Sequence, residues 1–141
     1  MYELLDHTAD VKFRARGGTL EEAFEESVEA FSDIVREGTE VELPEDVDST
    51  EVEISSENPE ALLFDFLDRL IYVQDVEGVL VTEAREVGIR ERGDDLRLRA
   101  VLGTTPITSE MALLDIKGPT YNDMRVETDD DGYVVEAVLD I

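Results

Sequence analysis

The residues of this chain that could bind a metal ion lie at its two ends. Near the N-terminus, Asp6-His7-Thr8-Ala9-Asp10 is a polar segment between two apolar, strand-like runs. At the other end, the chain stops at Leu139-Asp140-Ile141, within an apolar strand-like run. Carboxylate oxygens are the ligands that Ca²⁺ and Mg²⁺ prefer. If the fold joins the two ends, we expect Asp10, Asp140 and the terminal carboxylate of Ile141 to bind a divalent cation: Ca²⁺ first, with Mg²⁺ or Mn²⁺ as alternatives.

Plainer interpretations of these residues compete with the cation site. Asp140 is one of 37 acidic residues, and most acidic side chains are simply solvated. From the residues alone, a solvated Asp140 is the more frequent case. His7 is the only histidine and could act as a metal ligand or as a general acid or base. A lone histidine beside Thr and Asp more often hydrogen-bonds a loop in place.

Lys117 is a further candidate, because only two of the 12 basic residues are lysines. It follows the apolar pair Leu113-Leu114, so one interpretation is a strand lysine whose stem covers apolar surface. The use of lysine in a chain that otherwise uses arginine favours a charge that contacts a phosphate or carboxylate group.

The charge of the chain restricts its environment and its partners. Its 37 acidic and 12 basic residues give a formal net charge of -25. Such self-repulsion destabilises a compact chain in dilute buffer, but molar salt screens it, since the Debye length falls to about 3 Å. The acids occur in every segment, which favours a halophilic protein over a dedicated acidic binding module. No basic stripe is present, so we expect no direct nucleic-acid binding.

The chain contains no cysteine, which excludes disulfides and thiol chemistry and fits a cytoplasmic protein. Neither a signal peptide nor an apolar run long enough to span a membrane occurs in it. At 141 residues it has the size of one ordinary domain. We therefore expect a soluble, cytoplasmic, single domain over residues 1–141.

The apolar pattern predicts two helices. Thr19 and Glu22 form a capping box for the first, which we expect to end at Gly38. Asn58 and Pro59 have the residue types of a helix cap and a first helical position, and they begin the second. Its broad apolar stripe is wide enough to pack against a sheet.

The rest of the chain is predicted to form strands, and Lys12, Arg14 and Arg16 are expected to face water from the second of them. Gly118-Pro119 is expected to interrupt the strand pairing. Two helices on one or two mostly antiparallel sheets give an α+β class. The expected strands cover residues 2–5, 11–16, 41–43, 51–54, 79–82, 87–92, 96–102, 111–117, 124–128 and 133–139.

Several segments together resemble the archease family over nearly the whole chain. One departure is Gly118-Pro119, where family members usually carry small or branched apolar residues; because proline lacks a ladder donor, we expect a bend or an edge strand there. The segments that carry the resemblance are Asp6-His7-Thr8-Ala9-Asp10-Val11, Gly18-Thr19-Leu20-Glu21-Glu22-Ala23-Phe24, Ala61-Leu62-Leu63-Phe64-Asp65-Phe66-Leu67, Lys117 with Thr120-Tyr121, and Leu139-Asp140-Ile141.

Archeases assist the RtcB-type tRNA-splicing ligase, which uses GTP and passes through a guanylylated histidine. The resemblance implies that this protein promotes guanylylation and multiple turnover of the ligase and broadens its choice of nucleotide, without being an enzyme itself. It further implies that Asp10, Asp140 and Ile141 hold the metal, and that Lys117 and His7 serve the activation of the partner.

Two other function classes stay open at this point. A small metal-dependent hydrolase using His7 would act without any ligase. A general chaperone or adaptor would use apolar surface, and removal of metal would leave it active.

Overall fold

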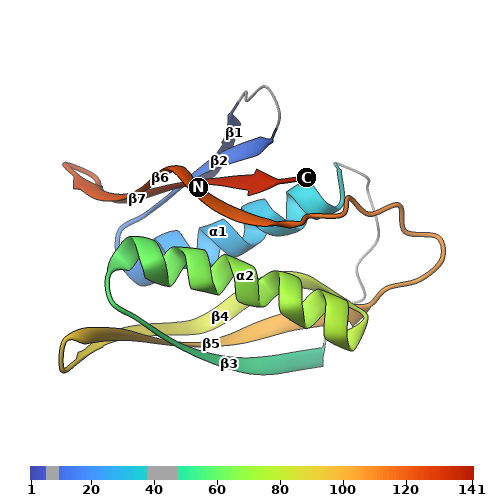
Figure 1. Cartoon of the computed structure of the whole chain (residues 1–141), viewed down its shortest axis with the longest axis horizontal. Coiled ribbons are helices and arrows are strands. Elements are labelled where there is room, and N and C mark those ends of the chain that lie inside the picture. The colour runs from blue at the N-terminus through green and yellow to red at the C-terminus, as the bar shows by residue number, and fades with distance from the viewer. Residues whose placement is uncertain (6–9, 38–47) are drawn as a thin grey trace.

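The structure is a computed structural model that describes residues 1–5, 10–37 and 48–141. Over these ranges the chain forms two helices and seven strands, and the strands make two antiparallel sheets. Figure 1 shows both helices between the two sheets, so that each sheet has one face on the helices and one face on solvent. The predicted α+β class is confirmed.

One sheet contains the first and last strands and is called the terminal sheet. Its order is β1-β2-β7-β6. The predicted strands 2–5 and 11–16 are confirmed, and the predicted strands 124–128 and 133–139 lie inside longer ones. The strands are β1 (Tyr2–Leu5), β2 (Val11–Gly17), β6 (Gly118–Asp129) and β7 (Gly132–Asp140).

The other sheet is built around a long hairpin and is called the hairpin sheet. Its order is β3-β5-β4, with strands β3 (Asp48–Ser56), β4 (Val79–Arg92) and β5 (Asp95–Pro106). The predicted runs 79–82 and 87–92 are parts of the single strand β4, whose register shifts twice along β5. The predicted strand 51–54 lies within β3, whereas 41–43 lies outside the described residues.

The helix α1 (Leu20–Val35) begins at the predicted capping box. The Thr19 hydroxyl accepts a hydrogen bond from the Glu22 N–H at 3.1 Å. The Glu22 carboxylate accepts one from the Gly18 N–H at 2.9 Å, one residue earlier than in the usual box. The helix ends at Val35, before the predicted stop at Gly38, which lies outside the described residues.

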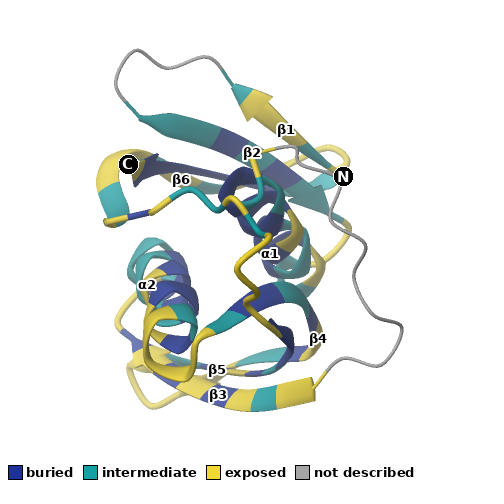
Figure 2. Ribbon diagram, turned by 90° about the vertical axis from the view of Figure 1, so that its right-hand side faces the viewer, coloured by how far each residue is buried: buried dark blue, intermediate teal, exposed yellow. Residues whose placement is uncertain are grey.

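The helix α2 (Pro59–Glu77) also begins as predicted, because the Asn58 side chain accepts a hydrogen bond from the Ala61 N–H at 2.8 Å. Gly78 ends it in the left-handed conformation, with φ of 64°. Phe24 of α1 stacks on Phe66 of α2, with ring centroids 5.8 Å apart, in the core between the sheets. Figure 2 shows the buried faces of both helices turned toward this interior.

The strand predicted over 111–117 is wrong. These residues lie outside all strands, although Ile116 is buried and Leu114 packs on the core. Isolated main-chain bonds hold the segment: Leu114 N–H donates to the Val35 carbonyl at 2.8 Å, and Lys117 N–H to the Asp140 carbonyl at 2.8 Å. Its apolar side chains fill the core although no strand pairs with the segment. A hydrophobic pattern alone cannot distinguish such an irregular buried segment from a paired strand.

The residues Gly118 and Pro119 begin β6 rather than interrupting the pairing, and Pro119 lies opposite Leu139. The strand β6 is at the edge of the terminal sheet, which is where a sheet tolerates proline. Further along, Thr120 pairs with Val138 and Arg125 pairs with Glu136, so residues 121–124 form a wide bulge in β6.

Gly17 permits the close approach of β2 to the start of α1, which gives a test of the packing. A Cβ at Gly17 would lie 2.5 Å from the Ala23 nitrogen, whereas a Cβ at Gly88 would meet no atom within 4 Å. We expect Gly17→Ala to lower the free energy of unfolding by about 1–3 kcal/mol through overpacking. Gly88→Ala, the matched control, should change it by less than about 1 kcal/mol. Urea unfolding in molar salt measures both, and equal effects would contradict this account.

Candidate metal centre

Three strand ends meet at one end of the terminal sheet. Val11 at the start of β2 pairs with Leu139, so Asp10 and Asp140 are the next residues along adjacent strands. Gly118 at the start of β6 pairs with Asp140. The Lys117 main chain is bonded to Asp140, as described above. The fold therefore brings Asp10, Asp140, Ile141 and Lys117 together from distant parts of the sequence.

Side-chain alternation places Asp10 and Asp140 on the same face of the sheet. Val135, Ala137 and Leu139 of β7 point into the core between the sheets. The alternate residues, which include Asp140, therefore point to the opposite face, away from the helices. Because Asp10 is the neighbour of Asp140 across the ladder, its side chain projects from that outer face as well.

The donor set at this place is small and consists of oxygen atoms. Within the described ranges, no group of three or more His, Cys, Asp or Glu side chains is placed to hold a metal ion. Asp10 and Asp140 supply two side-chain carboxylates, so the predicted set needs the main-chain carboxylate of Ile141 as its third member. Hard oxygen donors of this kind fit Ca²⁺ or Mg²⁺ better than zinc or copper. His7 lies outside the described residues, and its predicted role stays a prediction.

The two lysines differ in their surroundings. Lys12 lies on the same outer face as Asp10, with its amino group 3.5 Å from the Glu136 carboxylate and its side chain only 19% exposed. Lys117 is exposed, and its side chain makes no ion pair with any carboxylate in the part of the chain that the structure describes. Of the two, Lys117 is thus the lysine whose charge is available to a partner.

Glu136 is a buried, ion-paired residue that the sequence analysis did not predict. Its side chain is 4% exposed although it lies on the outer face of the terminal sheet. The Arg14 Nε donates to Glu136 at 2.7 Å, and Arg125 Nε lies 3.8 Å from the same carboxylate. Burial alone would raise the Glu136 pKa, but the Arg14 hydrogen bond and the charges of Arg125, Lys12 and Arg14 outweigh it, so this pKa lies below its usual value.

The Glu136 cluster corrects the expectation for β2. Lys12 and Arg14 were expected to face water, but they lie over Glu136 and are partly buried. Arg16 is more exposed and pairs with Asp129 at 2.6 Å. The sequence did carry one signal, because Glu136 alternates with Val134 and Val138 along the last strand and so shares a face with them. Both valines are buried, although no helix covers that face.

The Archease protein family (MTH1598/TM1083) matches this chain over residues 2–141. A protein archease of Pyrococcus abyssi is 36% identical over 143 residues, which cover 99% of this chain and 98% of that protein. The chain belongs to the archease family.

Solved structures of similar proteins agree with the fold. The solution structure of Methanobacterium thermoautotrophicum protein 1598 has a TM-score of 0.79 and 29% identity, and the match covers 99% of this chain and 98% of that chain. The crystal structure of a Thermotoga maritima archease, described as a possible chaperone, has a TM-score of 0.57 at 23% identity over 100% and 98% of the two chains. At that identity the second match supports the archease fold alone. Among the described residues, no helix is both long and apolar enough to cross a membrane.

Glu136→Gln tests the buried charge cluster. The change leaves Arg14 and Lys12 without the carboxylate they contact, so we expect the free energy of unfolding at pH 7 to fall by about 1–3 kcal/mol. The folded-state pKa of Glu136 is lowered, so its contribution is complete above the unfolded-state value of about 4.3 and disappears as the pH falls through the folded-state pKa. The difference between the variant and the wild type should therefore shrink in acid.

Urea unfolding at pH 7 and at successively lower pH values measures this difference. Glu127→Gln is the control, because Glu127 is exposed and, among the described residues, pairs only with Arg125, at 3.4 Å. It should change the free energy of unfolding by less than about 1 kcal/mol. If Glu136→Gln lowers the free energy of unfolding by the same amount below the folded-state pKa as at pH 7, the ionised Glu136 carboxylate is not the stabilising group.

Calorimetric titration tests the cation site directly. We expect Ca²⁺ to bind the wild-type archease and, at 100 times its Kd, to stabilise it by about 2.7 kcal/mol. Asp140→Asn should abolish both the heat of binding and the rise in Tm. Asp130→Asn, in the β6–β7 turn, is the control for loss of one negative charge. Equal Ca²⁺ binding by the Asp140→Asn variant would exclude Asp140 as a ligand.

Proposed function

We propose that this archease binds a divalent cation through Asp10, Asp140 and the carboxylate of Ile141, and that it activates an RtcB-type tRNA-splicing ligase. The observation that supports the proposal is the meeting of β2, β7 and the start of β6, where Asp10 and Asp140 are neighbours across the ladder and the Lys117 main chain is bonded to Asp140. Ca²⁺ is the first candidate for the cation, with Mg²⁺ and Mn²⁺ as alternatives. Membership of the archease family supports the role of an accessory protein.

The residues around the site would act in different ways. A bound divalent cation would neutralise the carboxylates and offer a positive centre to a phosphate or carboxylate oxygen of the partner. Asp10 and Asp140 would hold it from adjacent strands. The exposed Lys117 would contact a phosphate group or an acidic side chain of the ligase.

In this proposal the protein carries out no RNA chemistry of its own. It promotes guanylylation of the ligase, allows many turnovers and broadens the choice of nucleotide. It acts in the cytoplasm, and its charge of -25 would be screened there by salt.

A general chaperone is the second candidate; the Thermotoga maritima archease, which shares the fold, is described as a possible chaperone. A chaperone would act on many unfolded proteins through apolar contacts, and Asp140 would then have no special importance. Suppression of aggregation of an unrelated protein, equal in wild type and in the Asp140→Ala variant, would favour this second function.

Multiple-turnover ligation by the cognate ligase in molar salt tests the proposal. We expect wild-type archease to raise the yield well beyond one product per ligase, because each ligase is guanylylated again. Asp140→Ala and Lys117→Ala should each lower this stimulation at least about ten-fold, which corresponds to a loss of about 1.4 kcal/mol. Lys117→Arg should restore only part of it, since the guanidinium differs from an amino group in shape and hydration.

Asp130→Ala is the control and should stimulate ligation as the wild type does. Unchanged stimulation by the Asp140→Ala variant would exclude the cation site from the function. Turnover of RNA ends or nucleotide by the archease without ligase would instead show a hydrolase, which was the alternative role suggested by His7.

A further inference from the structure

We propose that Tyr121 is a contact residue for the ligase and that it binds an arginine-bearing segment of that partner through the exposed face of its ring. The inference depends on the proposed function, because it names a surface for the same partner. It is carried by the bulge in β6, by the packing of the Tyr121 ring and by the charges around it.

The bulge turns Tyr121 out of the strand ladder. Residues 121–124 of β6 stand between the pairs Thr120–Val138 and Arg125–Glu136. The Asn122 N–H donates to the Thr120 hydroxyl at 3.0 Å, and Asp123 has a φ of 61°, which a non-glycine residue rarely adopts. Bulges of this kind re-aim a side chain. Tyr121 is accordingly 56% exposed.

A second contact fixes the orientation of the exposed ring. The Tyr121 ring stacks on Phe64 of α2, with centroids 4.2 Å apart and planes 5° apart. One face of the ring thus lies on Phe64, and the exposure comes from the rest of the ring. An aromatic side chain held in this way loses little conformational entropy when a partner binds, which is typical of strong contact residues.

The ring lies close to the candidate metal centre. Gly118 pairs with Asp140, and Tyr121 follows Gly118 by three residues along β6. At no more than about 3.3 Å per residue, the main chain of Tyr121 lies within roughly 10 Å of that of Asp140 along the strand. A single partner segment could therefore contact both places.

The charges around the ring favour a cationic partner. Asp123 lies in the same bulge and is exposed, and Asp68, one helical turn after Phe64 on α2, is exposed and lines the groove that also contains Tyr72. The whole chain has a net charge of -25. An arginine side chain can stack on a tyrosine face while it donates hydrogen bonds to nearby carboxylates. A nucleobase could also stack there, but these carboxylates would repel its phosphates.

The chain offers a matched control in Tyr72. This residue is 59% exposed, so it equals Tyr121 in exposure. It lies two turns after Phe64 and lines a groove with Asp68 of α2 and with Glu53 and Ser55 of β3, but its ring does not stack on Phe64. Comparison of the two tyrosines therefore separates the effect of losing any exposed tyrosine from the effect of losing the ring that stacks on Phe64.

Calorimetry in molar salt, at the same concentration for every variant, measures binding of the purified ligase to variants of the whole chain. We expect Tyr121→Ala to weaken binding roughly ten-fold, as truncation of an anchoring aromatic residue does. Tyr121→Phe keeps the ring and should bind within about two-fold of the wild type. Tyr72→Ala should also remain within about two-fold. Thermal unfolding checks that every variant folds.

A second measurement tests the chemistry of the partner. Phenylglyoxal modifies accessible arginines of the ligase, and after this treatment the wild type and Tyr121→Ala should bind with equal, weakened affinity. A single-stranded RNA oligonucleotide serves as the other probe. If RNA binds the wild type but not Tyr121→Ala, a base rather than an arginine occupies the ring, and the inference is overturned.

Other results would also overturn it. Unchanged binding by Tyr121→Ala, an equal loss for Tyr72→Ala, or a loss for Tyr121→Phe as large as for Tyr121→Ala would each exclude the stacked ring as the contact. If the wild type stimulates ligation and Tyr121→Ala binds and stimulates equally, only this inference fails. If the wild type neither binds nor stimulates the ligase, the proposed function fails and the inference fails with it.

Discussion

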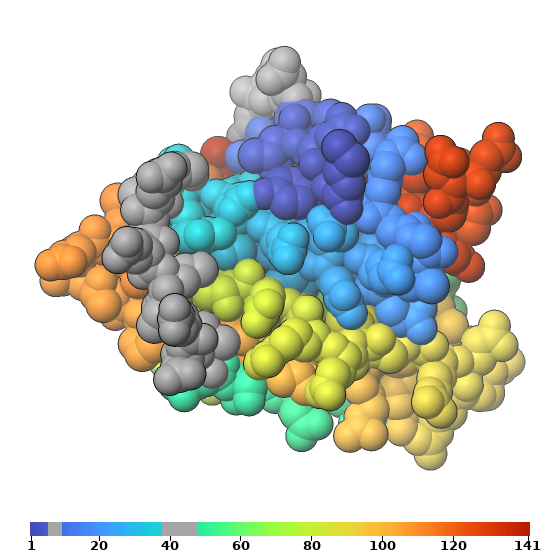
Figure 3. Space-filling view, turned by 180° about the vertical axis from the view of Figure 1, so that it is seen from behind, coloured from blue at the N-terminus to red at the C-terminus, as the bar shows by residue number. Residues whose placement is uncertain are grey.

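The antiparallel ladder between β2 and β7 is the contact on which the rest of this structure depends. It joins strands from the two ends of the sequence and closes the terminal sheet over the helices. Figure 3 shows, from the back, the N-terminal strands lying along α1. The same ladder puts Asp10 beside Asp140, so the packing of the core and the candidate metal centre have one structural cause.

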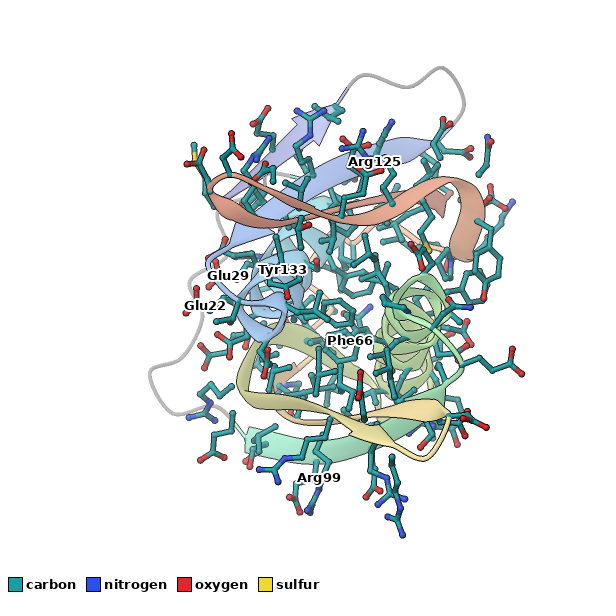
Figure 4. The ribbon with its side chains drawn as sticks, turned by 90° about the vertical axis from the view of Figure 1, so that its left-hand side faces the viewer. Glu22, Glu29, Phe66, Arg99, Arg125 and Tyr133 are labelled. Atoms are coloured by element: carbon teal, nitrogen blue, oxygen red, sulfur yellow. The ribbon has the colours of Figure 1, made fainter. Side chains whose placement is uncertain are left out.

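The position of the helices explains why both outer sheet faces are charged. Because α1 and α2 fill the space between the sheets, the apolar side of each sheet is covered, and its other side meets solvent. Figure 4 shows Arg125 and Arg99 pointing outward from opposite sheets, with Phe66 between them. On these faces arginines pair with glutamates, as Arg97 does with Glu53 at 3.1 Å. Such ion pairs place charged side chains on the exposed strand faces and offset part of the negative charge of this strongly acidic chain.

Sequence reasoning succeeded where the determinants are local and failed where they are distant. The caps at Thr19 and Asn58 follow from neighbouring residues, and they were predicted correctly. Residues 111–117 have an apolar pattern, but whether a strand lies beside them depends on the whole fold. The burial of Glu136 depends on three cations from β2 and β6. The likeness to archeases suggested which acids to examine, but only the register placed Asp10 next to Asp140.

The hydrogen bond from the Lys117 N–H to the Asp140 carbonyl has a consequence for recognition. It ties the irregular segment before β6 to the last residue of β7, so both are ordered once the protein has folded. Any molecule that approaches this edge meets main-chain groups that this bond already holds in place. The edge is therefore preorganised, and its association with a partner need not wait for the local backbone to rearrange.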